Sequence, residues 1–142
     1  SITFADTTGA MGEEDVEAAL TDWRDSHPDT RGIGFRALSE GFRSRNPDMA
    51  NLYLQIQRSN PPRDISGGIL YGGPKGAELK KITMPVQFIV GEEDEITPPH
   101  VLQIASDHIE GSRVIVIPDS GHSVYFEKPD IFNFEVGRFI DP

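Results

Sequence analysis

The hydrophobic pattern of residues 81–141 predicts two strands that alternate with two helices. PVQFIV is a continuous apolar run bounded by Pro85 and Gly91, as expected for a strand buried on both faces, and RVIVIPDS predicts a second strand. TPPHVLQIASDHI and EKPDIFNFEVGRFI repeat apolar residues every three or four positions, which is typical of helices. Thr97 is the expected N-cap of the first helix and Pro98 its first residue. The predicted inward-facing residues are Val101, Ile104, Ala105 and Ile109 in the first helix, and Ile131, Phe132, Val136 and Phe139 in the second. A strand, a helix and a strand predict a parallel α/β sheet.

Residues 1 to about 80 show helical periodicity where they show any pattern. SITFAD predicts a short strand with Ile2 and Phe4 on one face. EEDVEAALTDW, RGIGFRALSEGF and NPDMANLYLQIQRS each predict a helix with one apolar stripe, and Pro47 suits the first position of the last. The stripes are Val16, Leu20 and Trp23, then Phe35, Leu38 and Phe42, then Leu52, Tyr53 and Ile56. The segment SNPPRDISGGILYGGPKG predicts a loop.

Charge and composition exclude several classes of function. The formal net charge is −10 and no basic cluster is present, so neither nucleic acid nor an anionic membrane surface is an expected partner. The absence of cysteine excludes disulfides and thiolate sites. No apolar run reaches the roughly 18 residues of a spanning helix, and no signal-peptide pattern is seen, so we expect a cytoplasmic protein. No Asp, Glu and His cluster has metal-ligand spacing, so no metal or other cofactor is expected.

Asp94 and His122 each follow a predicted strand. Asp94 lies three residues past Gly91 in the acidic loop GEEDEI, and His122 lies in PDSGHSVYFEKP. Because the carboxyl ends of parallel strands meet at one edge of the sheet, the two side chains are expected to lie together. The carboxylate would accept the Nδ1–H of the imidazole and leave Nε2 free as a general base. Taken alone, Asp94 is more consistent with a solvated turn acid, and His122 alone is also consistent with a turn histidine bound to backbone. Their paired positions favour the catalytic interpretation.

The segments MPVQFIVGEEDEITPP and PDSGHSVYFEKPDIFN resemble the C-terminal third of α/β-hydrolase fold enzymes. They are similar to the branch of cofactor-independent esterases, lactonases and C–C hydrolases. The shared pattern, over about residues 81–141, is a strand, G-x-x-D, a Pro-started helix, a strand, and G-H before the last helix. The resemblance implies that Asp94 is the acid and His122 the base of a catalytic triad.

The same resemblance implies an organisation of the chain. Residues 1–6 would be a core strand, residues 7–78 a helical cap, and residues 79–142 the C-terminal part of the hydrolase core. Apolar cap residues would then shape the substrate pocket, with Val124 near its mouth. The candidate substrate-binding residues are Trp23, Phe35, Phe42, Tyr53 and Val124. Packing within the cap is the alternative role for the four aromatic residues.

The sequence departs from the family at the nucleophile, which the family places upstream in a G-x-S-x-G turn. No such motif is present: ALSEG around Ser39 has Ala in place of the first Gly, and its flank RGIGFR is a poor buried strand. Ser1 as an N-terminal nucleophile would need a β-rich sandwich that is not predicted. We therefore expect the nucleophile and oxyanion hole on the N-terminal half of the same hydrolase, present as a separate chain or removed. A three-stranded sheet would leave an apolar face and an unpaired edge, so this chain is not expected to persist alone.

The sequence thus predicts the C-terminal part of a serine-type α/β hydrolase that cleaves an ester, lactone or activated carbonyl of a small apolar substrate. Two alternatives stay open. An epoxide hydrolase or haloalkane dehalogenase would use the same Asp–His relay with an upstream Asp nucleophile. A hydrolase-fold receptor or subunit would bind a small apolar ligand without turnover.

Overall fold

Three parallel strands form the centre of the molecule. The structure, a computed structural model, describes residues 1–61 and 73–141. Within them, β1 (Ile2–Ala5), β2 (Val86–Gly91) and β3 (Arg113–Ile117) form one sheet in the order β1-β2-β3. Phe4 pairs with Phe88, which pairs in turn with Val114. Every residue of the central strand β2 is buried, because it has a neighbour on each side and helices on both faces. The predicted strands are confirmed.

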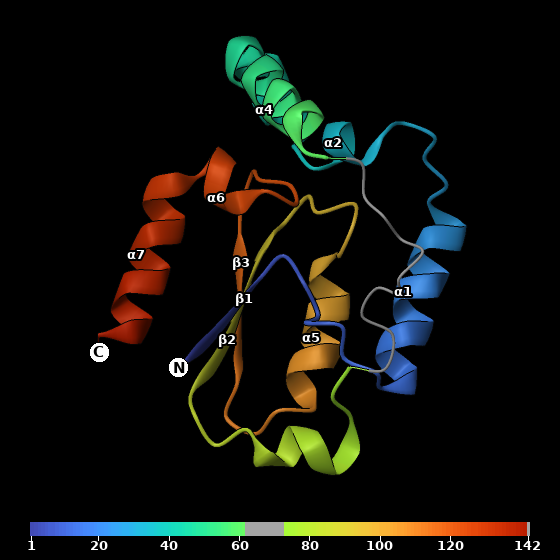
Figure 1. Cartoon of the computed structure of the whole chain (residues 1–142), viewed down its shortest axis with the longest axis vertical. Coiled ribbons are helices and arrows are strands. Elements are labelled where there is room, and N and C mark those ends of the chain that lie inside the picture. The colour runs from blue at the N-terminus through green and yellow to red at the C-terminus, as the bar shows by residue number, and fades with distance from the viewer. Residues whose placement is uncertain (62–72, 142) are drawn as a thin grey trace.

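Helices cover both faces of the sheet (Figure 1). On one face lie α5 (Pro99–Asp107), which connects β2 to β3, and α1 (Glu14–Ser26), which packs against α5. On the other face lie α6 (Val124–Glu127) and α7 (Pro129–Ile140). Side chains of β2 alternate between the two cores: Phe88 and Val90 pack with α5, and Ile89 packs with Val124. The short 3₁₀ helix η1 (Gly76–Lys81) leads into β2.

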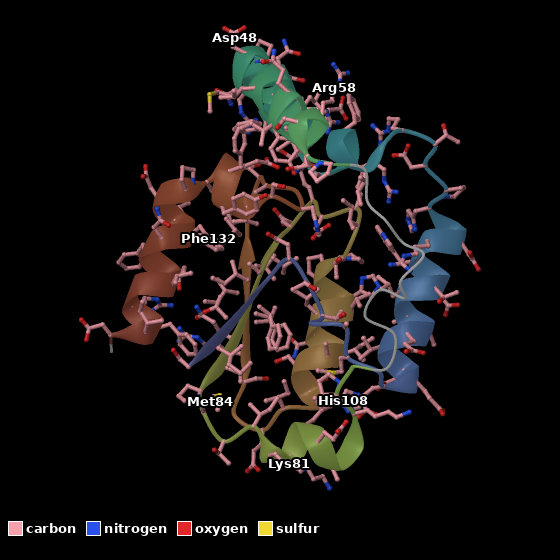
Figure 2. All side chains as sticks on the ribbon, viewed as in Figure 1. Asp48, Arg58, Lys81, Met84, His108 and Phe132 are labelled. Carbon is pink, nitrogen blue, oxygen red and sulfur yellow. The ribbon has the colours of Figure 1, made fainter. Side chains whose placement is uncertain are left out.

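Three further helices stand beyond the carboxyl ends of the strands, and we call them the cap helices: α2 (Ile33–Arg36), α3 (Glu40–Arg45) and α4 (Pro47–Ser59). They share a small apolar cluster with residues from the core side, whose members are Ala37, Leu38, Phe42, Ala50, Tyr53, Ile96 and Phe126. Figure 2 places Asp48 and Arg58 of α4 beyond one end of the sheet, opposite Lys81 and Met84 at the other end. The cap helices therefore face the edge where strand-end loops gather.

Two helix boundaries differ from the prediction. RGIGFRALSEGF is not one helix, because Ser39 is extended (φ −61°, ψ 151°) and its side chain accepts a hydrogen bond from Phe42 N–H, which starts α3 as a separate element. Helix α5 is capped by Pro98 rather than Thr97 and begins at Pro99. The residue before a proline is kept out of helical geometry, so Pro99 holds Pro98 in the extended conformation.

Several predicted inward-facing residues are exposed. Leu52 and Ile56 of α4 are 44% and 49% exposed, whereas Tyr53 is buried. Among the described elements α4 packs mainly on α2 and α3, so only one of its sides is covered. Ile131 of α7 is also exposed, and the segment before α7 forms the additional one-turn helix α6. The predicted loop at residues 59–76 lies largely outside the described residues. In the described ranges, no helix is long and apolar enough to cross a membrane.

Candidate active site

Asp94 and His122 meet at the carboxyl edge of the sheet, as the sequence predicted. Nδ1 of His122 lies 2.9 Å from Oδ2 of Asp94. The other carboxylate oxygen, Oδ1, accepts the backbone N–H groups of Ile96 at 2.7 Å and Thr97 at 2.8 Å. Asp94 is 2% exposed, so water competes little for these bonds. Because a carboxylate only accepts hydrogen bonds, Nδ1 is the donor and Nε2 of neutral His122 is left as the basic nitrogen.

The environment of His122 strengthens it as a base. Burial alone would lower the pKa of His122, but the hydrogen bond and negative charge of Asp94 outweigh burial and raise that pKa above its usual 6.5. The side chain of His122 remains partly exposed and lines a cavity. Among the described residues, no side chain forms a hydrogen bond with Nε2. This nitrogen is therefore available to a group that enters the cavity.

The loops that carry Asp94 and His122 are packed directly against each other. Glu93 N–H donates to the Ser120 carbonyl at 2.9 Å. At Gly91, the last residue of β2, a Cβ atom would lie 2.1 Å from the Gly121 carbonyl oxygen and 2.3 Å from that of Ser120. Such distances are far inside van der Waals contact, so only glycine permits this approach. The close approach fixes the separation of the two strand-end loops.

A buried carboxylate joins the His122 loop to the cap helices. Oε1 of Glu127 accepts the N–H groups of Ser39 at 2.8 Å and Gly121 at 3.0 Å, and Oε2 accepts the Ser39 hydroxyl at 2.6 Å. The Ser39 hydroxyl thus donates to Glu127 while it accepts from Phe42 N–H. Sequence reasoning missed Glu127, whose partner Ser39 lies 88 residues away.

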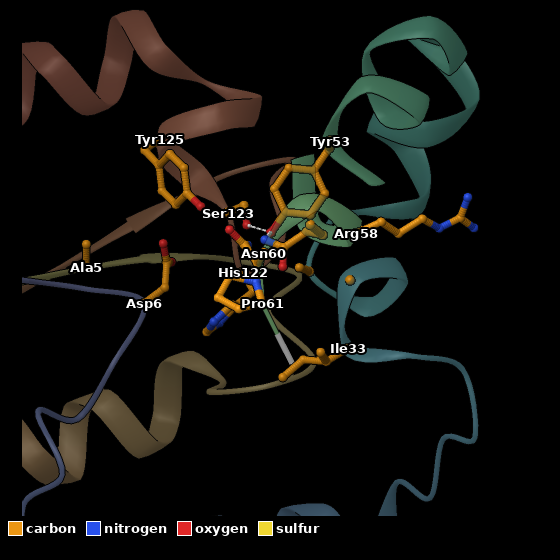
Figure 3. Close-up of a pocket in the computed structure, with 13 residues that line it drawn as sticks. Ala5, Asp6, Ile33, Tyr53, Arg58, Asn60, Pro61, His122, Ser123 and Tyr125 are labelled. Carbon is orange, nitrogen blue, oxygen red and sulfur yellow. Dashed lines mark hydrogen bonds between the residues drawn. The ribbon is translucent and has the colours of Figure 1, made fainter. Parts of the chain in front are cut away.

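Two further contacts tie the cap to the residue after His122. Ser123 N–H donates to the Ala37 carbonyl at 2.9 Å. The Tyr53 hydroxyl lies 2.7 Å from the Ser123 hydroxyl (Figure 3). The loop that bears the histidine is therefore held from the sheet side by Gly91 and from the cap side by α2, α3 and α4.

A cavity of about 670 Å³ lies between this loop and the cap. His122, Asp6, Tyr53 and Tyr125 line it, together with small or apolar residues of α2 and its end, Ile33, Gly34 and Ala37. The polar residues Gln57, Arg58 and Asn60, at the end of α4, also line it. Its volume is in the range typical of small-molecule sites.

Of the five candidate substrate-binding residues, the structure places only Tyr53 on the lining of this cavity. Phe42 is buried in the cap cluster, and Val124 is fully buried against the sheet. The ring of Phe35 packs under the Arg43 guanidinium, 4.1 Å from the centroid. The Trp23 indole donates to the Glu95 carbonyl at 3.0 Å and lines a different hollow. Sequence periodicity identified apolar faces, but these four side chains pack or bond elsewhere.

Asp6 is a residue of this edge that the sequence analysis did not single out. It follows β1 directly, lines the cavity and is only 4% exposed. Burial, and next the charge of Asp94, raise its pKa from 3.8 to about 8. The strand-end argument used for Asp94 and His122 applies equally to an acid after SITFA, so the signal was present in the sequence. In the described part of the chain, no group of three or more His, Cys, Asp or Glu residues is arranged to hold a metal ion.

Comparisons with known proteins agree with this architecture. A family model described as alpha/beta hydrolase fold matches residues 22–129. A pimeloyl-[acyl-carrier protein] methyl ester esterase from Neisseria meningitidis serogroup C is 33% identical over 105 residues, which cover 74% of this chain and 36% of that protein. A proline iminopeptidase from Saccharolobus solfataricus is 36% identical over 64 residues, or 45% of this chain and 20% of that protein.

Solved structures share the fold. A thermophilic esterase from Thermogutta terrifontis superposes with a TM-score of 0.72 at 20% identity and covers 98% of this chain and 54% of its own. The chain thus spans about half the length of this structure and about a third or less of the two curated relatives.

Proposed function

The chain belongs to the alpha/beta hydrolase fold family, and from this membership we propose that its Asp94–His122 pair serves the hydrolysis of an ester, lactone or activated carbonyl. The observation that carries the proposal is the 2.9 Å contact between Nδ1 of His122, which lines the cavity, and the buried Asp94, because this contact leaves Nε2 as the basic nitrogen. Relatives named as esterases favour carbonyl hydrolysis over other chemistry of the fold.

In the proposed reaction, Nε2 of His122 removes the proton of a nucleophilic hydroxyl as that oxygen attacks the carbonyl carbon. The imidazolium, stabilised by Asp94, then protonates the leaving alkoxide and an acyl-enzyme forms. A water molecule takes the place of the alcohol and attacks the acyl carbon while His122 removes its proton. When the second tetrahedral intermediate collapses, the imidazolium returns a proton to the oxygen of the nucleophile as that oxygen leaves, and the carboxylic acid is released. Backbone N–H groups would stabilise each oxyanion, an effect of about 3 kcal/mol per donor.

We further propose that the nucleophile and oxyanion hole belong to a partner segment, the N-terminal half of the same hydrolase. Three observations support this assignment. The sequence holds no G-x-S-x-G motif. The hydroxyl of Ser39 is bound to Glu127 rather than directed at His122. Within the described residues, β1 pairs on one side only, so its other edge is open to a further strand.

The cavity favours a small substrate with an apolar body. Ile33, Ala37 and the rings of Tyr53 and Tyr125 contribute apolar surface to the cavity that His122 lines. The substituents of the carbonyl would pack against this surface, and any polar group of the substrate could bind Gln57, Arg58 or Asn60.

The proposal is tested by the intact mass of every chain in the purified protein, before and after a fluorophosphonate probe. We expect the adduct on a segment other than residues 1–142, which would establish that Asp94 and His122 act on a partner's serine. An adduct on Ser39 or Ser1 would show that this chain carries its own nucleophile.

Absence of any adduct would favour one of two other functions. An aspartate nucleophile, as in epoxide hydrolases and haloalkane dehalogenases, would take up ¹⁸O from labelled water into the carboxylate during a single turnover. A ligand-binding receptor would show saturable binding of ester analogues and no product. The intact Asp94–His122 hydrogen bond favours catalysis over such a receptor.

A further inference from the structure

Asp6 combines three unusual features at one position. Its side chain is buried, and neither carboxyl oxygen has a hydrogen-bond partner of good geometry among the described residues. Its backbone has a positive φ of 54°, a region that few residues other than glycine adopt, although Asp and Asn do so more often than most. The backbone is held there, because Asp6 N–H donates to the Ile89 carbonyl at 2.8 Å. A buried carboxyl without a well-formed hydrogen bond costs stability, and such groups cluster at functional sites, as do residues with positive φ.

The charged groups around Asp6 belong to the catalytic pair. The charge of Asp94, on the loop after β2, raises the pKa of Asp6, and the charge of His122, on the loop after β3, lowers it. Figure 3 shows Asp6 and His122 at the same cavity. The positive charge of Arg36 in α2 acts in turn on His122. The other titratable or charged side chains that line the cavity are Tyr53, Arg58 and Tyr125.

The protonation state of Asp6 follows from this environment. Burial and the neighbouring Asp94 raise its pKa to about 8. The charge of His122 and the N–H groups of Val124 and Gly91 act in the opposite direction without overcoming burial. At neutral pH, Asp6 is therefore mainly a neutral carboxylic acid, and Asp94 is the charged acid beside His122.

We propose that Asp6 is a positioning residue of the site: while neutral it leaves Asp94 as the single negative charge on His122, and its ionisation switches the reaction off at alkaline pH. This inference rests on the proposed hydrolase function. When Asp6 loses its proton to solvent, the second negative charge opposes the developing oxyanion. The same charge favours imidazolium over the neutral imidazole that must accept a proton. Because Asp6 and His122 interact, the active form is the one in which the pair holds a single proton, on Asp6.

The first test is the pH profile of kcat/KM for ester hydrolysis by the intact protein that carries these residues. The wild type is expected to lose activity above pH 8, about tenfold per pH unit. For Asp6→Asn, whose side chain is neutral at every pH, kcat/KM is expected to rise through the His122 titration and then stay level.

Asp119→Asn is the matched control, because Asp119 is exposed and has a similar φ of 51° but lies outside the cavity lining. The kcat/KM of Asp119→Asn should fall above pH 8 as that of the wild type does. An unchanged alkaline limb in Asp6→Asn would overturn the proposal.

The second test needs no activity. Carbon-13 NMR of labelled Asp carboxyl carbons should show one signal that titrates near pH 8, is absent in Asp6→Asn and remains in Asp119→Asn. Absence of that signal in the wild type would overturn the proposal. If the protein hydrolyses no ester, the proposed function fails, and this titration alone decides whether Asp6 is neutral at pH 7.

The pH dependence of protein stability provides a third test, and its direction follows from the raised pKa of Asp6. The folded state holds the Asp6 proton up to about pH 8, whereas the unfolded chain releases it near its usual pKa of 3.8. The free energy of unfolding of the wild type therefore decreases between pH 4 and 8. Asp6→Asn has no carboxyl group at this position and should not show this decrease. The melting temperature of Asp6→Asn should exceed that of the wild type at pH 7 and match it below pH 4. Equal melting temperatures at pH 7 would contradict a raised pKa.

Discussion

The sheet and the cap helices bury their residues to different extents. Every residue of β2 is buried, and the loops after β2 and β3 touch through the backbone at Gly91. The cap helices bury one side only, so Met49, Leu52 and Ile56 of α4 are exposed. Asp94 and His122 follow the rigid strands, whereas Tyr53, on the cavity wall, belongs to the cap. The groups proposed for proton transfer are therefore fixed by the core, and the cap shapes the space above them.

A substitution of Asp94 tests whether the core carries the chemistry, and it should reduce activity more than any other change. Asp94→Asn keeps an oxygen that can accept the Ile96 and Thr97 N–H groups, so the loop should stay folded. The new amide no longer accepts from His122 Nδ1 and favours the wrong tautomer. We expect kcat for ester hydrolysis to fall by about 10⁴ with little change in the melting temperature. Near-normal turnover would remove Asp94 from the proposed mechanism.

A pair of glycine substitutions tests the rigidity of the core. Gly91→Ala would place a methyl group about 2 Å from two carbonyl oxygens of the His122 loop. We expect a loss of about 3 kcal/mol in the free energy of unfolding, measured by urea titration. Gly137→Ala is the control, since no atom lies within 4 Å of its added Cβ on α7. It should stabilise the helix by about 1 kcal/mol. Equal effects of the two substitutions would show that the loops have room to separate.

Glu127 tests how strongly the cap depends on the core. Glu127→Ala leaves the Ser39 N–H, the Ser39 hydroxyl and the Gly121 N–H without their shared acceptor. A buried unpaired donor costs about 1–3 kcal/mol, and local relaxation should bring the total to about 3 kcal/mol. Glu127→Gln retains one acceptor oxygen and should lose less than half as much. The stability of each variant is measured by urea titration. A loss as large in the Gln variant would mean that the charge, rather than the hydrogen bonds, holds the cap.

The hydrogen bond between Tyr53 and Ser123 tests the contribution of the cap helices alone, and its loss should change stability least. Tyr53→Phe removes the hydroxyl that bonds Ser123 and should cost about 1 kcal/mol of stability. Because Tyr53 also lines the cavity, KM should rise a few-fold while kcat changes less. A double-mutant cycle with Ser123→Ala isolates the pair, and a coupling energy near zero would show that this bond contributes nothing.

Sequence reasoning succeeded where the determinant is local. A buried strand followed by a polar loop is visible in PVQFIVGEED and in RVIVIPDSGH, and topology alone brings Asp94 and His122 together. The same rule would have found Asp6. Glu127 could not be found this way, because its burial depends on Ser39, 88 residues away. The cavity lining was also beyond reach, since an apolar stripe does not tell which of Phe42, Tyr53 or Val124 meets solvent and which meets protein.

The contacts of this site differ widely in the length of chain that each one closes. The Asp94–His122 bond joins residues 28 apart within a single β2-α5-β3 unit. Asp6 reaches the site only when Ile2 pairs with Val86. The cap helices are attached only when Glu127 forms its hydrogen bonds with Ser39, 88 residues away. The entropy lost on closing a loop grows with its length, and local contacts form fastest. During folding, the Asp94–His122 pair should therefore form before Asp6 reaches the site and before the cap helices dock. The orientation of His122 would then be fixed before the cavity that it lines is complete.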